Sequence, residues 1–539
     1  MLFCWMLWSL LAFMAPISSA LVTGLMPRIM SGLHSAGPLS TIAYALELAI
    51  WQFTDLPPWQ LFFQPDNVPT MNQAEMLCIP SYAAIAPDHG MMVLSLHGSV
   101  RRPADVPTSF VDDMVNLFLI EASITKESGW RSHFQALSTT GYDDLARRRM
   151  HHMVLQKPFA ANVTANIPYG SPGTISFETD GAGDFRVMVQ VNTTAASSDP
   201  DLTKQPVCHT GITHIPIKLA FTNDPTKAHT VLADTYLVPP YGLTISTDVD
   251  DILRIAEVWN WKQALLWVLA RPFTPWRNMP EILQSWTLDN TTHFHYATDS
   301  ITLNAPYYIE GIRQYYPHGS FDFRPFSLDP IRIAFEISYV FKSEEEHKKA
   351  EDELIASGVM HRGTPYDEVM HPRYHNTKRL LKAFPKRNFI LMGDTTPGSV
   401  TDAFSRLALE FPDQVACVLI RDTHATEPAD WMASDTWRFL KLPSNKYYFF
   451  ATPDDLKQIP IDHIRDIADG KATGCFPSNM TRPVNSLKPN RIRGKAFFAI
   501  FRGLWYRIRC GLHRKSCPFE HTHFKLPSDH TPRAEHDEL

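Results

Sequence analysis

Hydrophobic and polar positions alternate along much of the first half of the chain. The period is two in "MMVLSLHGSV" (91–100), "GTISFETDG", "DFRVMVQVN" and "HTVLADTYLV", and turn-forming residues separate these runs. Alternation of this kind is typical of strands with one buried face, which are common in antiparallel sheets. The pattern predicts a small antiparallel β domain over residues 91–240, in which "FVDDMVNLFLIEASI" is expected to be a helix.

The pattern changes after residue 240. Strand-length runs become continuously apolar, as in "GLTIST", "HFHYAT", "RNFILMGD" and "ACVLIRD", and helix-length segments such as "YHNTKRLLKAFP" and "DAFSRLALEFP" separate them. Buried strands that alternate with helices indicate an α/β fold with a doubly wound, mainly parallel sheet. We predict this domain over residues 241–485. Residues 21–90, which are rich in proline and aromatic residues, are expected to form an irregular or pro-like segment.

Composition adds little to this picture except at the end of the chain. The chain has 539 residues, 44% of them hydrophobic, and a net charge of −6, so no general nucleic-acid surface and no nucleic-acid partner are expected. The tail, residues 486–539, interleaves basic and aromatic residues between 488 and 515. Two interpretations remain open: a helix that makes peripheral contact with anionic lipid, or a helix that docks on the α/β domain.

Both ends of the chain resemble targeting signals. Residues 1–20 form an apolar run that closes on small residues, which predicts a cleaved signal peptide, with an uncleaved anchor as the rival interpretation. The last four residues spell HDEL, an endoplasmic reticulum retrieval signal. We therefore expect a protein of the endoplasmic reticulum lumen, with secretion as the alternative. Glycosylation triplets agree with this and begin at Asn162, Asn192, Asn290 and Asn479.

Cysteines are few, and their spacing does not suggest a zinc site. Cys417 lies inside the apolar run "VACVLIRD", so we expect it to be a buried free thiol. Cys510 and Cys517 are the first pair to test for a disulfide.

Acidic residues gather where two of the apolar runs end. Asp248 and Asp250 follow "GLTIST", and Asp394 ends "RNFILMGD". Carboxyl ends of parallel strands meet at one edge of a sheet, so these three acids can form an oxygen cage for Mg²⁺. One aspartate could then attack phosphorus while its neighbour protonates the leaving group. An acidic cluster of this size is also common in solvated turns and helix N-termini, and Asp251 has no assigned role.

Five ordered blocks identify a family resemblance. They are "LVPPYGLTISTDVDDILRIAEV", "RPFTPWRNMPEILQSW", "FHYATDS", "LLKAFPKRNFILMGDTTPG" and "EFPDQVACVLIRD". The segment 238–422 resembles the catalytic domain of the actin-patch-type phosphatidate phosphatases of the haloacid dehalogenase (HAD) superfamily. The resemblance implies a HAD-like fold with Mg²⁺, in which Asp248 is the nucleophile that forms an aspartyl-phosphate. It also implies that Asp250 is the general acid/base and binds Mg²⁺ through its carbonyl, that Thr298 contacts the phosphoryl group, and that Asp394 binds the metal.

The chain departs from the family pattern at three positions. Ile252 stands where the family has threonine, and Arg373 falls on the catalytic lysine, with Lys378 further along. Ser399 replaces an acid, for which Asp402 is a possible substitute. Two functions follow: a Mg²⁺-dependent lipid phosphate phosphatase that converts phosphatidic acid to diacylglycerol, or a catalytically weakened HAD-like protein that binds anionic lipid or a protein partner.

Overall fold

The structure is a computed structural model. It describes residues 74–103, 144–149, 156–158, 161–193, 211–222, 229–324, 371–427 and 436–480, apart from a few positions within these ranges. All of them lie in the compact unit Met1–Arg491. The expected signal peptide, the helix at 110–124, the tail 486–539 and the Cys510–Cys517 pair lie outside the described residues. Among the helices that are described, none is long and apolar enough to cross a membrane.

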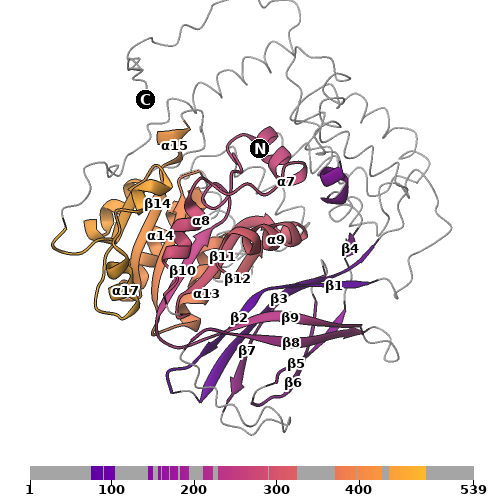
Figure 1. Cartoon of the computed structure of the whole chain (residues 1–539). Helices are drawn as coiled ribbons and strands as arrows, with labels where there is room; N and C mark the ends of the chain where they lie inside the picture. Colours follow the sequence, from indigo (N-terminus) through magenta and orange to yellow (C-terminus); the bar gives the residue numbers. More distant parts are fainter. Residues whose placement is uncertain are drawn as a thin grey trace, which may run out of the picture. The chain divides into compact units, whose positions relative to one another are not determined.

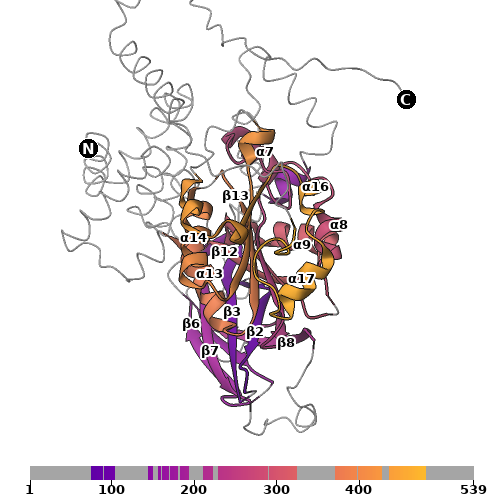
Figure 2. The ribbon, with the colours of Figure 1, turned by 90° about the vertical axis from the view of Figure 1, so that its left-hand side faces the viewer.

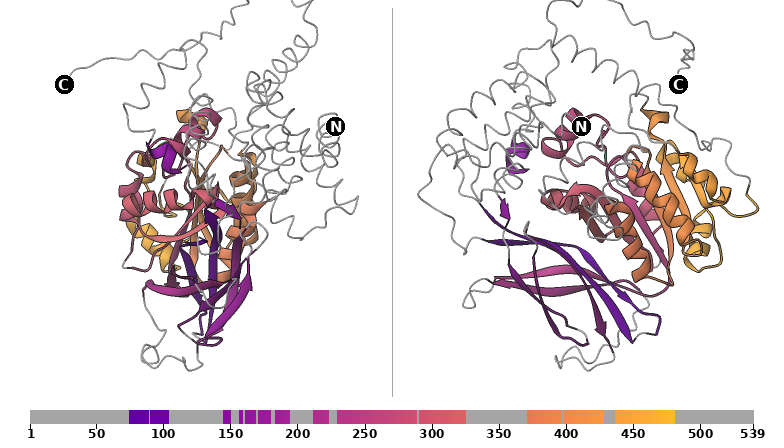
Figure 3. Two further views of the ribbon diagram at one scale, coloured as in Figure 1. Left: turned by 90° about the vertical axis from the view of Figure 1, so that its right-hand side faces the viewer. Right: turned by 180° about the vertical axis from the view of Figure 1, so that it is seen from behind.

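Nine described strands form a curled, mainly antiparallel sheet (Figures 1 and 3). The strands are β1 (Glu75–Ile79), β2 (Ser81–Ile85), β3 (Met91–Pro103), β4 (Gln156–Pro158), β5 (Asn162–Asn166), β6 (Thr174–Glu178), β7 (Asp184–Asn192), β8 (Thr213–Thr222) and β9 (His229–Val238). Their order is β1-β3-β2-β9-β8-β5-β6, with β4 and β7 also paired to β3, and only the β2–β9 pair is parallel. The predicted antiparallel strands are thereby confirmed.

The alternating pattern explains which side of this sheet is buried. On β5, Val163 and Ala165 are fully buried, Thr164 between them is half-buried, and the flanking Asn162 and Asn166 are exposed. On β8, the residues at every second position from Ile215 to Phe221 are buried in the same core. One face of the sheet therefore carries the core of this part of the chain.

The sheet begins earlier than expected, because β1 and β2 lie inside the segment 21–90 that we predicted to be irregular. Both strands run along the same side of β3, and Pro80 separates them. Strands of five residues interrupted by proline are too short to show a period in the sequence. Pairing with β3, not local pattern, makes them strands.

A second sheet is entirely parallel and holds six described strands. They are β10 (Leu243–Asp248), β11 (His293–Ile301), β12 (Gly319–Arg324), β13 (Asn388–Asp394), β14 (Val415–Arg421) and β15 (Tyr447–Phe450). Their order is β12-β11-β10-β13-β14-β15. Strands β11 and β12 lie on one side of β10, and strands β13, β14 and β15 lie on the other, so the strand order reverses between β10 and β13. The predicted parallel sheet is confirmed.

Helices cover both faces of this sheet (Figure 2). They are α7 (Trp261–Leu269), α8 (Met279–Ser285), η3 (Thr302–Asn304), α9 (Ala305–Tyr315), α13 (Pro372–Ala383), α14 (Gly398–Glu410), α15 (Thr423–Thr426), η4 (Trp437–Lys441), η5 (Ser444–Lys446), α16 (Pro453–Leu456) and α17 (Ile461–Ala468). Proline occupies the first turn of α8, α9, α13 and α16, where its fixed φ suits a helix start. The two helices predicted by name, α13 and α14, are confirmed.

Successive residues of β13 show why the sheet has two covered faces. Ile390 and Met392 belong to the core shared with α8, α9 and α17, whereas Phe389 and Leu391 belong to the core shared with α13 and α14. A strand buried on both sides needs apolar residues at every position. This is the physical origin of the continuously apolar runs.

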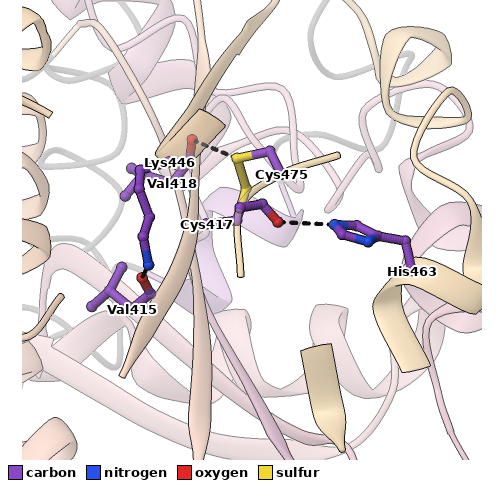
Figure 4. Close-up of a disulfide and its surroundings, with 7 residues drawn as sticks. Val415, Cys417, Val418, Lys446, His463 and Cys475 are labelled. Atoms are coloured by element: carbon purple, nitrogen blue, oxygen red, sulfur yellow. Dashed lines mark hydrogen bonds between the residues drawn. A yellow bond between two sulfur atoms is a disulfide. The ribbon is translucent and has the colours of Figure 1, made fainter. Parts of the chain in front are cut away.

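Cys417 forms a disulfide with Cys475, so the prediction of a free thiol was wrong (Figure 4). The two Cα atoms are 4.9 Å apart and both residues are buried. The Gly474 amide donates to the Ala416 carbonyl at 2.9 Å, and His463 contacts the Gly474 carbonyl at 3.0 Å. An apolar run reveals that a cysteine is buried, but not which distant segment packs beside it.

Candidate active site

Three of the predicted site residues come from neighbouring strands of the parallel sheet. Asp248 ends β10, Asp394 ends β13, and Thr298 lies in β11 one residue after Ala297, the partner of Asp248. Gly393 lets α14 approach β13, since a Cβ at this position would overlap the Val400 side chain. The predicted residues therefore meet at the carboxyl edge, beside the point where the strand order reverses, which is where open α/β sheets bind ligands.

Asp248 is held by an ion pair with Arg373. The Nη2 atom of Arg373 lies 3.0 Å from Oδ1 and 3.1 Å from Oδ2 of Asp248, and the Val249 amide donates to Oδ1 at 2.9 Å. Burial raises the pKa of Asp248 to about 7; the Arg373 charge opposes this rise, while Asp299 and Asp250 add to it. Asp248 therefore titrates near neutral pH, where a small change in the charge around it alters its ionisation.

Arg373, and not Lys378, occupies the cationic position of the site. Arg373 is buried and also lies 3.4 Å from Asp299, whereas Lys378 pairs with Glu410 at 2.5 Å. Burial lowers the pKa of Arg373, but the charges of Asp248 and Asp299 more than offset this, so the pKa is raised overall. Within the described part of the chain, its Nε and Nη1 atoms are buried without a hydrogen-bond partner. Two unused donors of a guanidinium suit an anionic ligand.

The Asp250 carboxylate faces a different set of groups. Its Oδ1 accepts from Arg254 Nε at 2.8 Å and from the Tyr308 hydroxyl at 2.9 Å. Its Oδ2 accepts from the Thr298 hydroxyl at 2.9 Å and from Tyr308 at 3.1 Å. Thr298 in turn accepts the Ser300 amide at 3.0 Å. Thr298 lies at the site as predicted, with its hydroxyl proton directed to Asp250.

The predicted metal ligands only partly converge. No group of three His, Cys, Asp or Glu side chains close enough to hold a metal occurs among the residues described. The Asp250 carboxylate faces Arg254, Tyr308 and Thr298. Asp394 is buried, accepts the Thr396 amide at 2.7 Å, and has a pKa raised well above the usual value by burial and by the Asp248 charge. Asp248 and Asp394 are buried carboxylates, and the charge of Asp248 raises the pKa of Asp394. Carboxylate oxygens are hard donors of the kind that fit Mg²⁺.

Asp251, which had no assigned role, supports the loop that follows the site. Its backbone has a positive φ of 56°, and its carboxylate accepts the amides of Ala256, Glu257 and Val258 at 2.8–3.0 Å. The next residue, Ile252, is fully buried in the core beneath the sheet edge. Asp251 therefore orders the loop, and Ile252 contributes packing where the family's threonine would supply a hydroxyl.

Sequence reasoning missed three residues at the site. Asp299 contacts Arg373 and accepts from Ser399 Oγ at 3.4 Å, and its position directly after Thr298 could have drawn attention to it. Arg254 and Tyr308 surround Asp250, but nothing in the local sequence distinguishes them from core residues. Asp402, the suggested substitute acid, pairs instead with Arg438 at 3.3 Å and with Arg406 at 3.4 Å.

A buried Ser-His-Asp chain lies away from this edge. His295 contacts Ser320 Oγ at 2.8 Å through Nδ1 and Asp322 at 3.2 Å through Nε2. Asp322 also pairs with Arg186 of the antiparallel sheet at 3.1 Å. Ser320 is fully buried, and its hydroxyl also contacts His293 at 2.9 Å, so the chain is a structural polar network.

Residues 243–422 match the family model "Phosphatidate phosphatase APP1, catalytic domain". The APP1 match consists of two overlapping segments, 243–362 and 360–422, and contains every predicted catalytic and metal-binding residue. It spans less than half of the chain. The antiparallel sheet and the segment after residue 422 lie outside it.

The other comparisons do not extend the APP1 match. No curated protein matches the chain. Among solved structures, the Parabacteroides merdae β-glucuronidase aligns with a TM-score of 0.22 and 9% sequence identity. That alignment covers 74% of this chain and 38% of the β-glucuronidase chain, so this protein spans well under half of that enzyme's length. A TM-score this low supports no statement about shared fold or activity.

Proposed function

We propose that the chain is a phosphatidate phosphatase-type phosphoric monoester hydrolase that converts phosphatidic acid to diacylglycerol. One observation carries the proposal: inside the segment that matches the APP1 catalytic domain, Asp248 is paired with a buried arginine that has two unused donors. A carboxylate nucleophile beside a guanidinium that has unused donors is an arrangement that suits a phosphate monoester.

A HAD-like doubly wound fold is part of the same proposal. The six parallel strands fill the sheet in the order third, second, first, fourth, fifth and sixth along the chain, and helices cover both faces. In such sheets ligands bind beyond the carboxyl ends of the strands, where the strand order reverses, and Asp248 ends β10 beside this point. We place the division between the β-rich domain, 91–240 extended back to β1, and the catalytic domain, 241–485, in the turn between β9 and β10.

The residues of the site divide the chemistry between them. Arg373 holds the phosphoryl oxygens through Nε and Nη1, and Asp248 attacks phosphorus to form an aspartyl-phosphate. Asp250 enters the reaction in its protonated form. As the phosphorus–oxygen bond to the glycerol breaks, it gives this proton to the leaving oxygen and becomes the carboxylate that accepts from Arg254, Tyr308 and Thr298. Asp250 then takes a proton from the water that attacks the aspartyl-phosphate, which releases phosphate and restores Asp248. Thr298, which donates its hydroxyl proton to Asp250 at 2.9 Å, would donate this proton to the phosphoryl group when Asp250 is protonated.

Mg²⁺ would be held by the carboxylates of Asp248 and Asp394 and by the Asp250 carbonyl. When bound there it neutralises phosphate oxygens and the repulsion between the carboxylates. Arg373 already compensates part of the Asp248 charge, so the two cations would share this carboxylate.

We propose the endoplasmic reticulum lumen as the compartment, reached through residues 1–20 and the C-terminal HDEL, with secretion as the alternative. The buried Cys417–Cys475 disulfide supports an oxidising environment, since such bonds are rare in the cytosol. The substrate would then be a phospholipid of the lumenal leaflet. Residues 488–515 would supply the peripheral membrane contact.

The test uses the full chain produced in a secretory host. Mg²⁺-dependent phosphate release from phosphatidic acid micelles is measured for the wild type and for Asp248→Asn. We expect release by the wild type and a loss of about 10³-fold or more in the variant, because the nucleophile is removed. No release above background, together with binding to anionic vesicles, would instead identify the catalytically weakened lipid-binding protein.

A further inference from the structure

The Asp250 carboxylate is surrounded by donors from three separate elements. Arg254 follows β10, Thr298 lies in β11 and Tyr308 lies in α9, and together they place four donor contacts of 2.8–3.1 Å on the two oxygens. Arg254 and Tyr308 are each only 1% exposed. An isolated carboxyl group rotates over a broad range about its terminal torsion, and donors on both oxygens restrict that rotation.

All three nitrogens of the Arg254 guanidinium already donate to side chains of the protein. Its Nε donates to Asp250, its Nη1 to the Tyr307 hydroxyl at 2.9 Å, and its Nη2 to the Tyr308 hydroxyl at 2.8 Å. Arg373 differs in this respect, because two of its nitrogens are without partners among the described residues. The two buried arginines of the site therefore differ in their contacts: Arg373 keeps nitrogens for an anionic ligand, and Arg254 holds the Asp250 carboxylate.

A residue outside the APP1 match, Arg149, contacts Tyr307, which is one of the partners of Arg254. Arg149, in the short helix 144–149, stacks its guanidinium 3.5 Å from the centre of the Tyr307 ring. The same guanidinium donates to the carbonyl of Val268 at 2.8 Å, at the end of α7. Tyr307 thus lies beside the guanidinium groups of both Arg149 and Arg254. The contact between Arg149 and Tyr307 indicates that the geometry around Asp250 also depends on residues outside the matched segment.

We propose that Arg254 and Tyr308 are positioning residues that hold the Asp250 carboxyl in the orientation needed to protonate the leaving oxygen. The inference rests on the proposed function and adds to it two residues that do not touch the substrate. A general acid works only within hydrogen-bond reach of the oxygen that it protonates. An error of about 1 Å in such a group costs on the order of 10²-fold in rate.

Two substrates separate positioning from general structural damage. The leaving group of dioctanoyl phosphatidate is an alkoxide, which needs a proton as it departs. The leaving group of p-nitrophenyl phosphate is a stable phenolate, which does not. We expect Arg254→Met to lower kcat/KM for the phosphatidate by about 10²-fold and Tyr308→Phe by about 10-fold, with kcat/KM for the aryl phosphate changed by less than about 3-fold. This ratio reports the steps up to departure of the leaving group, and it is independent of the later attack of water on the aspartyl-phosphate, in which Asp250 acts for both substrates. KM for both substrates should stay near the wild-type value, because the Arg254 nitrogens are engaged with Asp250, Tyr307 and Tyr308 and Arg254 is not assigned a contact with the phosphate.

Rescue and control variants complete the design. Arg254→Lys keeps the charge but not the planar fork, so it should recover only part of the phosphatidate activity. Tyr296→Phe is the matched control, since this buried tyrosine donates to the Pro317 carbonyl and is not in contact with Asp250. It should leave the ratio of the two activities unchanged.

Three outcomes are decisive. A selective loss on the phosphatidate in the Arg254 and Tyr308 variants supports the inference. Equal losses on both substrates, or no loss on either, with an active wild type, overturn it while leaving the proposed function in place. A wild type that hydrolyses neither substrate overturns the proposed function and the inference together.

Discussion

The ion pair between Asp248 and Arg373 predicts a stability effect that depends on pH. Asp248 is buried, and its pKa lies near 7 against an ordinary value of 3.8. Between these two values the folded chain binds a proton that the unfolded chain has released. Stability therefore falls as pH rises through this window, by up to about 1.4 kcal/mol per pH unit, and this contribution levels off above pH 7.

Arg373→Met removes the charge that opposes the effect of burial on Asp248. The pKa of Asp248 then rises beyond 7, so the fall in stability continues into the alkaline range. Below pH 6 the carboxyl is protonated in both proteins, and the electrostatic cost of the substitution is small. Above pH 7 the cost should grow by up to about 1.4 kcal/mol per pH unit, towards the roughly 3–5 kcal/mol typical of a broken buried ion pair.

The assay is urea unfolding of four proteins between pH 5 and pH 9: the wild type, Arg373→Met, Asp248→Asn and the double variant. The difference between Arg373→Met and wild type should increase with pH. The same substitution made in the Asp248→Asn protein should cost an amount that changes less with pH, because the carboxyl closest to Arg373 no longer titrates and only Asp299 and Asp394 still act on it. A pH-independent cost in the wild-type background, or an equal increase in the Asp248→Asn background, would refute the reasoning.

Two further predictions concern the remainder of the described chain. Cys475→Ser removes the disulfide to Cys417, which joins residues 58 apart, and should lower the free energy of unfolding by about 4 kcal/mol in urea unfolding. Reductant should destabilise the wild type but not this variant. Asn162 and Asn192 are exposed, whereas the Asn290 amide already donates to a backbone carbonyl at 2.9 Å. In a secretory host, Asn162→Gln and Asn192→Gln should each remove one endoglycosidase-sensitive glycan by mass, and a mass loss in Asn290→Gln would contradict this interpretation.

Much of the fold could be predicted because each sheet leaves a local pattern in the sequence. Strands with one buried face alternate, as in β5, and strands covered on both faces are continuously apolar, as in β13. Exceptions occur where an element depends on distant partners. β1 and β2 are strands because they lie along β3, and no local period marks them.

The same distinction applies to the site. Asp248 and Asp394 could be predicted because each ends a strand and parallel strands end at a common edge, whereas Thr298, which lies within β11, was predicted from the family resemblance. Arg254 and Tyr308 could not, since one lies in a loop and the other in a helix 54 residues later, and only packing brings both onto Asp250. The choice between Arg373 and Lys378 was likewise open until α13 was in place, because a helix presents these two positions to different surroundings.

The sequence by itself determined the two kinds of sheet, the edge at which the acids gather and the residues that can act there. These properties follow from short periods and from the order of residues along the chain. Only the tertiary structure decided which arginine faces Asp248, which groups orient Asp250, that Asp251 supports a loop, and that Cys417 is bonded to Cys475. Each of these depends on side chains that are distant in the sequence, and their proximity is set by packing rather than by local pattern.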